Sequence, residues 1–132
     1  MKTIFSKLIS GELPCYKVAE TKEFLAFLDI NPNTLGHTLC IPKNAQDKIF
    51  DLSKLEYIQL MSFTRDVALA IRKTVKCKRI GMSIIGLEVP HVHVHLIPIN
   101  EMKDITFQKK VKVDSKIMTQ LSKNIAKNFN RI

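Results

Sequence analysis

The order of patterns along this 132-residue chain predicts a single α+β domain built on an antiparallel sheet. Three short strand-like runs come first, then a long helical pattern, then two more strand-like runs and a last helical pattern. Grouped strands, rather than strands alternating one by one with helices, are typical of α+β proteins. The composition agrees, because 45% apolar and 25% charged residues describe a chain that folds into a globular domain.

The first elements are a helical turn and a hairpin. Residues 4–9 have helical spacing, and Gly11 and Pro14 end that segment. Residues 16–19 and 24–28 are short apolar runs separated by a polar tetrapeptide, which predicts two antiparallel strands.

A turn-rich loop, a third strand and a long helix follow. Residues 31–36 contain Asn, Pro and Gly, which favour turns, and residues 37–41 have strand character. Asp51 and Ser53 are both suitable N-caps for a helix over residues 54–76. Its predicted buried stripe is Tyr57, Leu60, Phe63, Val67, Ala70, Ile71 and Val75.

The last elements are a second hairpin and a second helix. Residues 79–85 and 91–99 are apolar runs on either side of a turn, and we expect both strands to be central in the sheet. Ser115 is a candidate cap for the final helix. The predicted apolar side of that helix is Ile117, Met118, Leu121, Ile125 and Phe129.

Cysteine usage and hydropathy indicate a cytosolic protein with no membrane partner. The three cysteines Cys15, Cys40 and Cys77 are odd in number and widely spaced, which argues against a disulfide framework. No apolar run is long enough to span a bilayer, and the first residues lack the pattern of a signal peptide.

The chain is basic, with a net charge of +9, and the excess is concentrated at its end. Seven Lys or Arg against one Asp give residues 109–132 a net charge of +6. This excess of positive charge suits a negatively charged partner such as a nucleotide or a nucleic acid. No aromatic residues interleave with these lysines as in stacking surfaces, so we expect a solvated helix face and keep nucleic-acid binding as the alternative.

Three of the four histidines fall within the segment His91-Val92-His93-Val94-His95. In a strand, alternate side chains share a face, so the three rings would form a row with a step of ~6.6 Å. The intervening valines would pack on a helix. Three rings on one face need many hydrogen-bond partners, which makes a purely structural role a poor explanation.

Two chemistries suit such a row of imidazoles. One is metal ligation, with His37 or Glu88 completing the site. The other is nucleophilic catalysis at phosphorus, in which the central ring, His93, attacks and its neighbours bind the phosphoryl oxygens. The nucleophile must be neutral, so its second nitrogen must be held, typically by a backbone carbonyl.

The triad and three further blocks resemble the histidine-triad (HIT) superfamily of nucleotide hydrolases and transferases. The similarity covers about residues 3–99 and leaves a basic C-terminal extension over 100–132. The blocks are TIFSKLISGELP at 3–14, FLAFLDINP at 24–32, GHTLCIPK at 36–43 and HVHVHLIP at 91–98.

The resemblance implies a HIT-like fold with a five-stranded sheet that extends across a homodimer, and a purine nucleoside monophosphate as ligand. It also implies that His93 forms a nucleotidyl-histidine that water then hydrolyses, with His91, His95 and His37 around it. Asp29 would accept hydrogen bonds from the ribose hydroxyls, as suits an acceptor-only carboxylate. The base would lie among Ile4, Phe5, Leu8, Leu13, Phe27 and Ile30.

Two departures from the family pattern shape the expected activity. Leu87 stands where members usually carry a glutamine that contacts phosphate or the leaving group, which favours a small leaving group such as an amine. Thr3 and Ser6 stand where some members have zinc-binding cysteines, so we expect no metal and no cofactor. A non-catalytic nucleotide-binding protein on the same fold is the alternative function.

Overall fold

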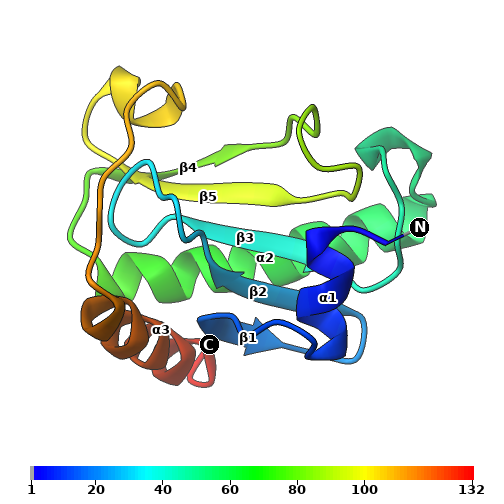
Figure 1. The fold of residues 1–132 in the computed structure, drawn as a ribbon, viewed down its shortest axis with the longest axis horizontal. Helices are drawn as coiled ribbons and strands as arrows, with labels where there is room; N and C mark the ends of the chain where they lie inside the picture. The colour runs from blue at the N-terminus through cyan, green and yellow to red at the C-terminus, as the bar shows by residue number, and fades with distance from the viewer. Residues whose placement is uncertain (1) are drawn as a thin grey trace.

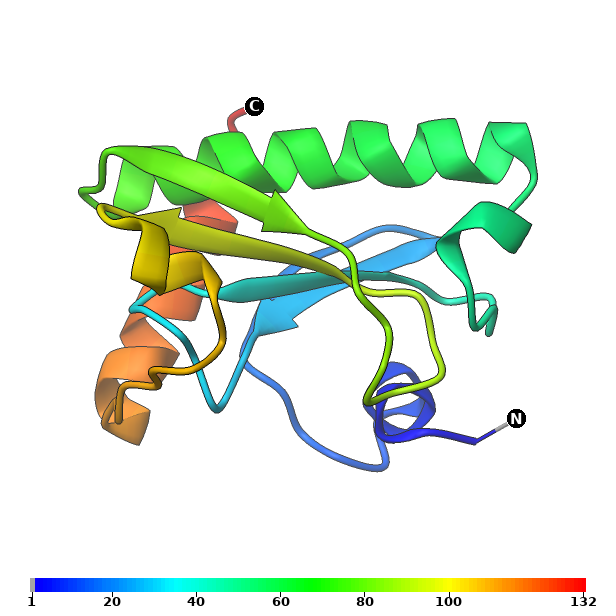
Figure 2. The same cartoon turned by 90° about the horizontal axis from the view of Figure 1, so that it is seen from above.

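The computed structural model describes residues 2–132 and has an α+β architecture (Figure 1). One antiparallel sheet carries a long helix on one side and a short helix on the other (Figure 2). The elements are α1 (Ile4–Ser10), β1 (Lys17–Glu20), β2 (Phe24–Leu28), β3 (Thr38–Pro42), η1 (Ile49–Asp51), α2 (Lys54–Thr74), β4 (Arg79–Ser83), β5 (Val94–Ile99), η2 (Met102–Ile105) and α3 (Ser115–Phe129).

The five strands are ordered β1-β2-β3-β5-β4, and every neighbouring pair is antiparallel. The chain leaves β3, passes through α2 and returns to the far edge as β4, and β5 then fills the place between β3 and β4. The predicted α+β class and antiparallel sheet are therefore confirmed. The second hairpin is not central as a unit, because β4 is an edge strand and only β5 is internal.

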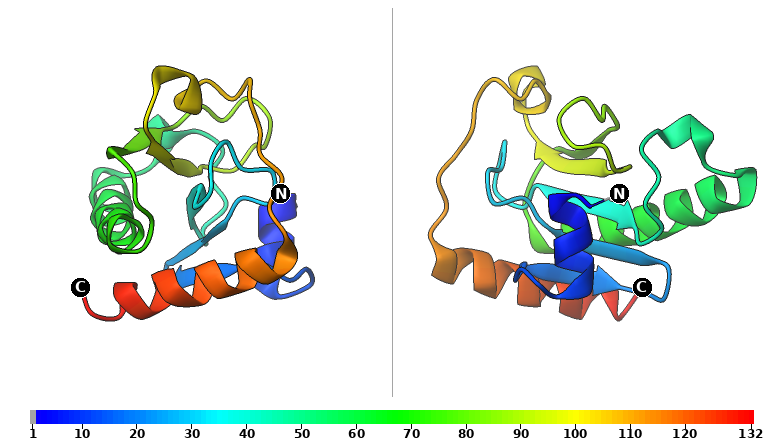
Figure 3. Two further views of the ribbon diagram at one scale, coloured as in Figure 1. Left: turned by 90° about the vertical axis from the view of Figure 1, so that its left-hand side faces the viewer. Right: turned by 45° about the vertical axis from the view of Figure 1, so that its right-hand side comes forward.

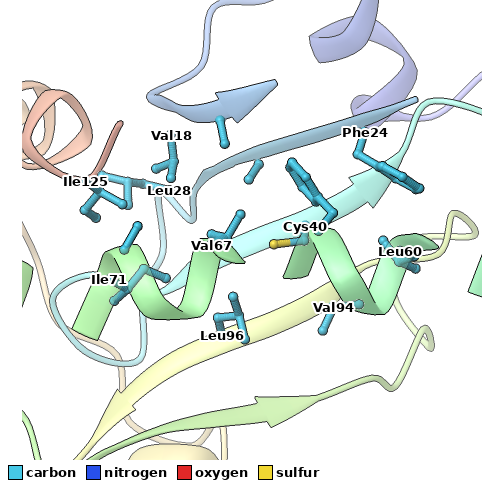
Figure 4. Packing of buried hydrophobic residues seen from close by; sticks show 14 of the residues in the cluster. Val18, Phe24, Leu28, Cys40, Leu60, Val67, Ile71, Val94, Leu96 and Ile125 are labelled. Atoms are coloured by element: carbon cyan, nitrogen blue, oxygen red, sulfur yellow. The ribbon is translucent and has the colours of Figure 1, made fainter. Parts of the chain in front are cut away.

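Strand alternation divides the core into two layers. Residues Phe24, Ala26 and Leu28 of β2 join the larger cluster beneath α2 and α3 (Figure 4). Leu25 and Phe27 of the same strand join a smaller cluster with Phe5 of α1. The large layer closes one side of the sheet, and the other side is covered only in part.

Ser53 is the N-cap of helix α2, because its hydroxyl accepts from the backbone N–H of Glu56. Of the two predicted caps, Asp51 is instead the last residue of η1. The helix ends two residues earlier than predicted, and Tyr57 is 37% exposed rather than part of the buried stripe. The stripe is otherwise correct for its fully buried members, which are Leu60, Phe63, Val67, Ala70 and Ile71.

Strand β5 begins at Val94, so the prediction that residues 91–93 belong to it is wrong. The Val92 N–H donates to the carbonyl of Gln46, a loop residue, at 2.7 Å and not to a neighbouring strand. His91 and His93 are nevertheless buried in the segment that leads into β5. Val92 and Val94 do lie in the core layer beneath α2, as predicted.

Helix α3 packs on α2 and β1 through Met118, Leu121 and Ile125. Its cap is Asp114 rather than Ser115, because the Asp114 carboxylate accepts from the Lys116 N–H at 2.7 Å. The predicted buried residue Ile117 is 52% exposed.

Between η2 and α3 the chain runs along one end of the sheet. We call residues 106–113 the C-terminal arm; Figures 1 and 3 show it descending beside the loop that joins β2 to β3. The Val111 N–H donates to the carbonyl of Pro32 in that loop. None of the described helices is long and apolar enough to cross a membrane.

Candidate active site

The four histidines converge on the sheet face opposite α2. His95 lies on β5, His37 immediately precedes β3, and β3 and β5 are hydrogen-bonded neighbours. The ring centroids of His37 and His95 are 5.2 Å apart, and those of His93 and His95 are 5.0 Å apart. His91 contacts the same cluster through Phe5, at 5.8 Å between ring centroids.

The hydrogen bond of His93 leaves one nitrogen free to act as a nucleophile. Its Nδ1 lies 2.7 Å from the backbone carbonyl of His91. A carbonyl can only accept, so Nδ1 carries the proton and Nε2 carries the lone pair. His91 is held in the same manner, because its Nε2–H donates to the carbonyl of Pro42 at 2.7 Å. The Nδ1 of His91 is buried without a hydrogen-bond partner.

A second chain of hydrogen bonds fixes the tautomers of His37 and His95. The backbone N–H of Asn33 donates to His37 Nδ1 at 2.9 Å. His37 must therefore carry its proton on Nε2, and this nitrogen lies 2.9 Å from His95 Nδ1. Nδ1 of His95 accepts, so the neutral ring presents an Nε2–H donor.

Burial keeps three of these rings uncharged near neutral pH. Burial is the main reason that the pKa of His37 is lowered to about 3, and repulsion from Lys110 and from a protonated His95 contributes to that value. Burial is also the main reason that the pKa of His95 is lowered to about 4, and His93 and Lys110 make smaller contributions to that value. The pKa of His91 is also lowered by burial, against an opposing hydrogen bond to Pro42. His37, His91 and His95 thus act as neutral hydrogen-bond donors and acceptors.

The histidines open into a cavity of about 710 Å³ between α1, β2 and the loop that precedes β5. His93 and His95 line it, whereas His37 and His91 lie behind its wall. Every residue predicted to contact the nucleotide lines this cavity, namely Ile4, Phe5, Leu8, Leu13, Phe27, Asp29 and Ile30. Ile30 is 77% exposed and Ile4 is 50% exposed, so these two form part of the rim.

The C-terminal arm supplies lining residues that the sequence pattern did not indicate. Thr106, Phe107 and Lys110 border the cavity. The Phe107 ring packs edge-on against His95, with 4.7 Å between centroids, and the Lys110 ammonium lies 5.0 Å from the Phe107 ring centre. In the sequence, Phe107 stands out only as a single aromatic residue in a polar stretch, and this does not predict where its side chain lies.

Asp29 lies where a carboxylate can meet both a sugar and the histidines. Its Oδ1 accepts from the Asn31 N–H at 2.8 Å, and its Oδ2 lies 3.6 Å from His37 Nε2. Burial raises its pKa, while the Asn31 hydrogen bond and Lys110 lower it. Asp29, His37 and His95 place one ligand atom each within 4.8 Å of one another and could hold a metal ion. A metal ion bound there would take the place of the hydrogen bond between His37 Nε2 and His95 Nδ1.

The two departures noted in the sequence have structural consequences. Leu87 is 89% exposed at the cavity mouth and offers no polar group to a ligand. Thr3 and Ser6 form a reciprocal cap at the start of α1, so both side chains are engaged in holding the helix that walls the cavity. All three cysteines are free, as expected.

The fold and this histidine cluster define a protein of the histidine-triad class. The model of the HIT domain family matches residues 10–102, and the chain belongs to that family. An uncharacterised HIT-like protein of Borreliella burgdorferi is 33% identical over 96% of this chain and 97% of its own length. The adenosine 5′-monophosphoramidase of Schizosaccharomyces pombe is 38% identical over 74% of both chains.

A solved structure extends the likeness beyond the family-model match. A zinc-bound histidine-triad family protein from Mycobacterium smegmatis superposes with a TM-score of 0.81 at 25% identity, covering 99% of this chain and 95% of its own. Family membership supports nucleotide hydrolase or transferase chemistry in general terms.

Proposed function

We propose that this protein hydrolyses or transfers nucleoside 5′-monophosphates, with an adenosine phosphoramidate as a suitable substrate. The observation that carries the proposal is the hydrogen bond from His93 Nδ1 to the His91 carbonyl, which leaves Nε2 as a lone-pair nucleophile at the cavity wall. The phosphoramidase relative supports the choice of leaving group. The apolar cavity wall suits a base, and the Asp29 carboxylate suits the ribose diol.

The reaction divides into two displacements at phosphorus. His93 Nε2 forms a bond to the α-phosphorus while the bond to the leaving nitrogen breaks, and that amine leaves with a proton taken from water. The Nδ1–H of the cationic nucleotidyl-histidine remains bonded to the His91 carbonyl. Water then attacks phosphorus while the bond between phosphorus and His93 Nε2 breaks and its electron pair returns to that nitrogen; the hydroxyl stays on the nucleotide and the proton returns to solvent. The Nε2–H of His95 is the donor placed to stabilise charge on the phosphoryl oxygens.

Replacement of the nucleophile tests the covalent route. His93→Ala should lower turnover of adenosine phosphoramidate at least 1000-fold while AMP still binds. Rates and calorimetric binding would be measured on wild type and variant together. Cys77→Ser is the control, because Cys77 is half-buried and does not line the cavity, and it should retain full turnover. Unchanged turnover in the His93 variant would exclude the nucleotidyl-histidine.

The same measurements separate the alternatives. A wild-type protein that binds AMP without turning over the phosphoramidate would be a nucleotide-binding module. The cluster of Asp29, His37 and His95 and the zinc-bound relative favour a metal site as the second candidate. Activity lost with a chelator and restored by zinc would identify that site as the functional one.

We also propose a homodimer joined at β4. This strand is a free sheet edge, whereas the other edge strand, β1, contacts α3. Met82 on β4 and Ile85 just beyond it are 56% and 52% exposed. An open edge with exposed apolar side chains is the kind of surface that pairs with a second copy.

A further inference from the structure

We propose that Lys110 is the residue that recognises the negative charge of the substrate, which makes the C-terminal arm part of the active site. This inference deepens the proposed function and rests on it. It concerns a residue beyond the segment that the HIT family model matches.

Negative side chains outnumber positive ones among the residues that line the cavity. Among the described residues that line it, Lys110 is the only lysine or arginine, while Asp29 and Glu88 contribute carboxylates. Burial keeps His37 and His95 neutral near pH 7. A nucleotide phosphate brings at least one negative charge into this space. Lys110 is therefore the one fixed positive charge available to compensate it.

Contacts with Asn33 and Phe107 hold the Lys110 ammonium in place. It donates to the side-chain carbonyl of Asn33 at 2.7 Å and lies over the face of Phe107. Asn33 is 3% exposed, and its backbone N–H holds His37. Its amide also donates to the Asp104 carbonyl at 3.0 Å. The lysine is exposed, yet its ammonium is tethered to the loop that fixes the His37–His95 pair.

The C-terminal arm has an unusual backbone conformation at Phe107. Phe107 has φ of 65°, in the left-handed region that non-glycine residues rarely adopt. Such a conformation persists where surrounding contacts determine it. Here the ring contacts His95 on one side and Lys110 on the other, so a single aromatic ring separates the ammonium from the triad. The arm therefore holds Lys110 on the side of the cavity where Phe107 meets His95, whereas α1 and β2 supply apolar lining residues.

The test compares a charged ligand with its neutral counterpart. Calorimetry would measure AMP and adenosine binding to wild type, Lys110→Met, Lys110→Arg and Lys109→Met. Lys109 is the matched control, because it is an exposed neighbour on the same arm that does not line the cavity. We expect Lys110→Met to weaken AMP about five- to tenfold and leave adenosine unchanged, Lys110→Arg to restore most of the affinity, and Lys109→Met to have no effect.

Several results would overturn the inference. Equal AMP affinity in Lys110→Met and wild type would show that the charge is unused. Equal loss of AMP and adenosine would show that the lysine only supports the arm, and equal loss in Lys109→Met would show that overall charge matters rather than this residue. Wild-type protein that neither binds AMP nor turns over the phosphoramidate would refute the proposed function itself. If the wild type turns over the phosphoramidate normally, any of the three variant results above would refute only the role of Lys110.

Discussion

At the scale of single residues, the tautomers of the histidines follow from two backbone groups. The Asn33 N–H can only donate and the His91 carbonyl can only accept, so these two contacts determine which nitrogen of His37, His95 and His93 carries the proton. The result is a donor on His95 and a free lone pair on His93, the two properties that a phosphoryl-transfer site requires side by side.

The neutral rings predict acid sensitivity. An unfolded histidine titrates near 6.5, whereas the pKa values of folded His37 and His95 are about 3 and 4. Between these values the unfolded state binds more protons, so stability rises with pH up to about 6.5 and falls below it. We expect each ring to cost about 1–2 kcal/mol between pH 6.5 and 5.

Urea unfolding at both pH values would measure this effect. His37→Asn, which removes one titrating ring, should show a smaller loss of stability over the same interval than wild type. Its starting stability is expected to be lower, because the Asn33 N–H and His95 Nδ1 lose their partner. An unchanged difference between the two pH values in the variant would contradict the assignment of a neutral His37. Asp29, whose pKa is raised by burial, acts in the opposite direction.

The candidate site could be predicted from sequence only where local spacing carried the information. The spacing of the histidines at every second residue predicted that the triad clusters. The blocks shared with the family predicted that Asp29 and the apolar residues lie at the same site. The strand assignment failed at His91 and His93, because this segment hydrogen-bonds to the loop at Gln46 instead of to a strand. Lys110 could not be found, since its contact with Asn33 joins positions 77 residues apart with no pattern to relate them.

At the scale of elements, glycines end α1 and lead into β3. Gly11 has φ of 85° and caps α1, and an added Cβ there would meet no atom within 4 Å. Gly36 has φ of 97°, and a Cβ would lie 3.0 Å from Val75 and 3.1 Å from Pro98. Gly36 is followed directly by His37. Gly36 is therefore required both by its positive φ and by the close approach of Val75 and Pro98, whereas Gly11 is required only by its positive φ.

These differences predict unequal effects of alanine. Gly11→Ala should lower the free energy of unfolding by about 1 kcal/mol, from the left-handed conformation alone. Gly36→Ala should lower it by about 2–4 kcal/mol, because Val75 and Pro98 must also shift. Denaturant titration of both variants measures the difference. We further expect reduced phosphoramidate turnover only in Gly36→Ala, since the backbone of His37 moves with it, and equal stability losses would refute the packing argument.

At the scale of the whole molecule, the order of the elements along the sequence predicted the fold class, but it did not predict which strands lie at the edges of the sheet. The class, the antiparallel sheet and the two covering helices followed from alternation and helical spacing, because burial on one side leaves a periodic trace in the sequence. The position of β4 at the edge left only a weak trace, and so both strands of its hairpin were expected to be central. In the structure the β4 residues are partly or fully exposed rather than buried.

That exposure leads to a prediction about assembly. If β4 pairs with its copy, light scattering should give twice the 15.1 kDa mass of one chain. Met82→Glu places a carboxylate on the β4 edge of both protomers, so the proposed interface would have to bury or pair two added charges, and the change should shift the protein to monomer. Ile30→Glu is the matched control, because Ile30 is a still more exposed apolar residue at the cavity rim, away from β4. It should remain dimeric. A wild-type monomer, or a dimer that withstands Met82→Glu, would place the interface elsewhere and leave the β4 edge as a bare strand that the protein tolerates.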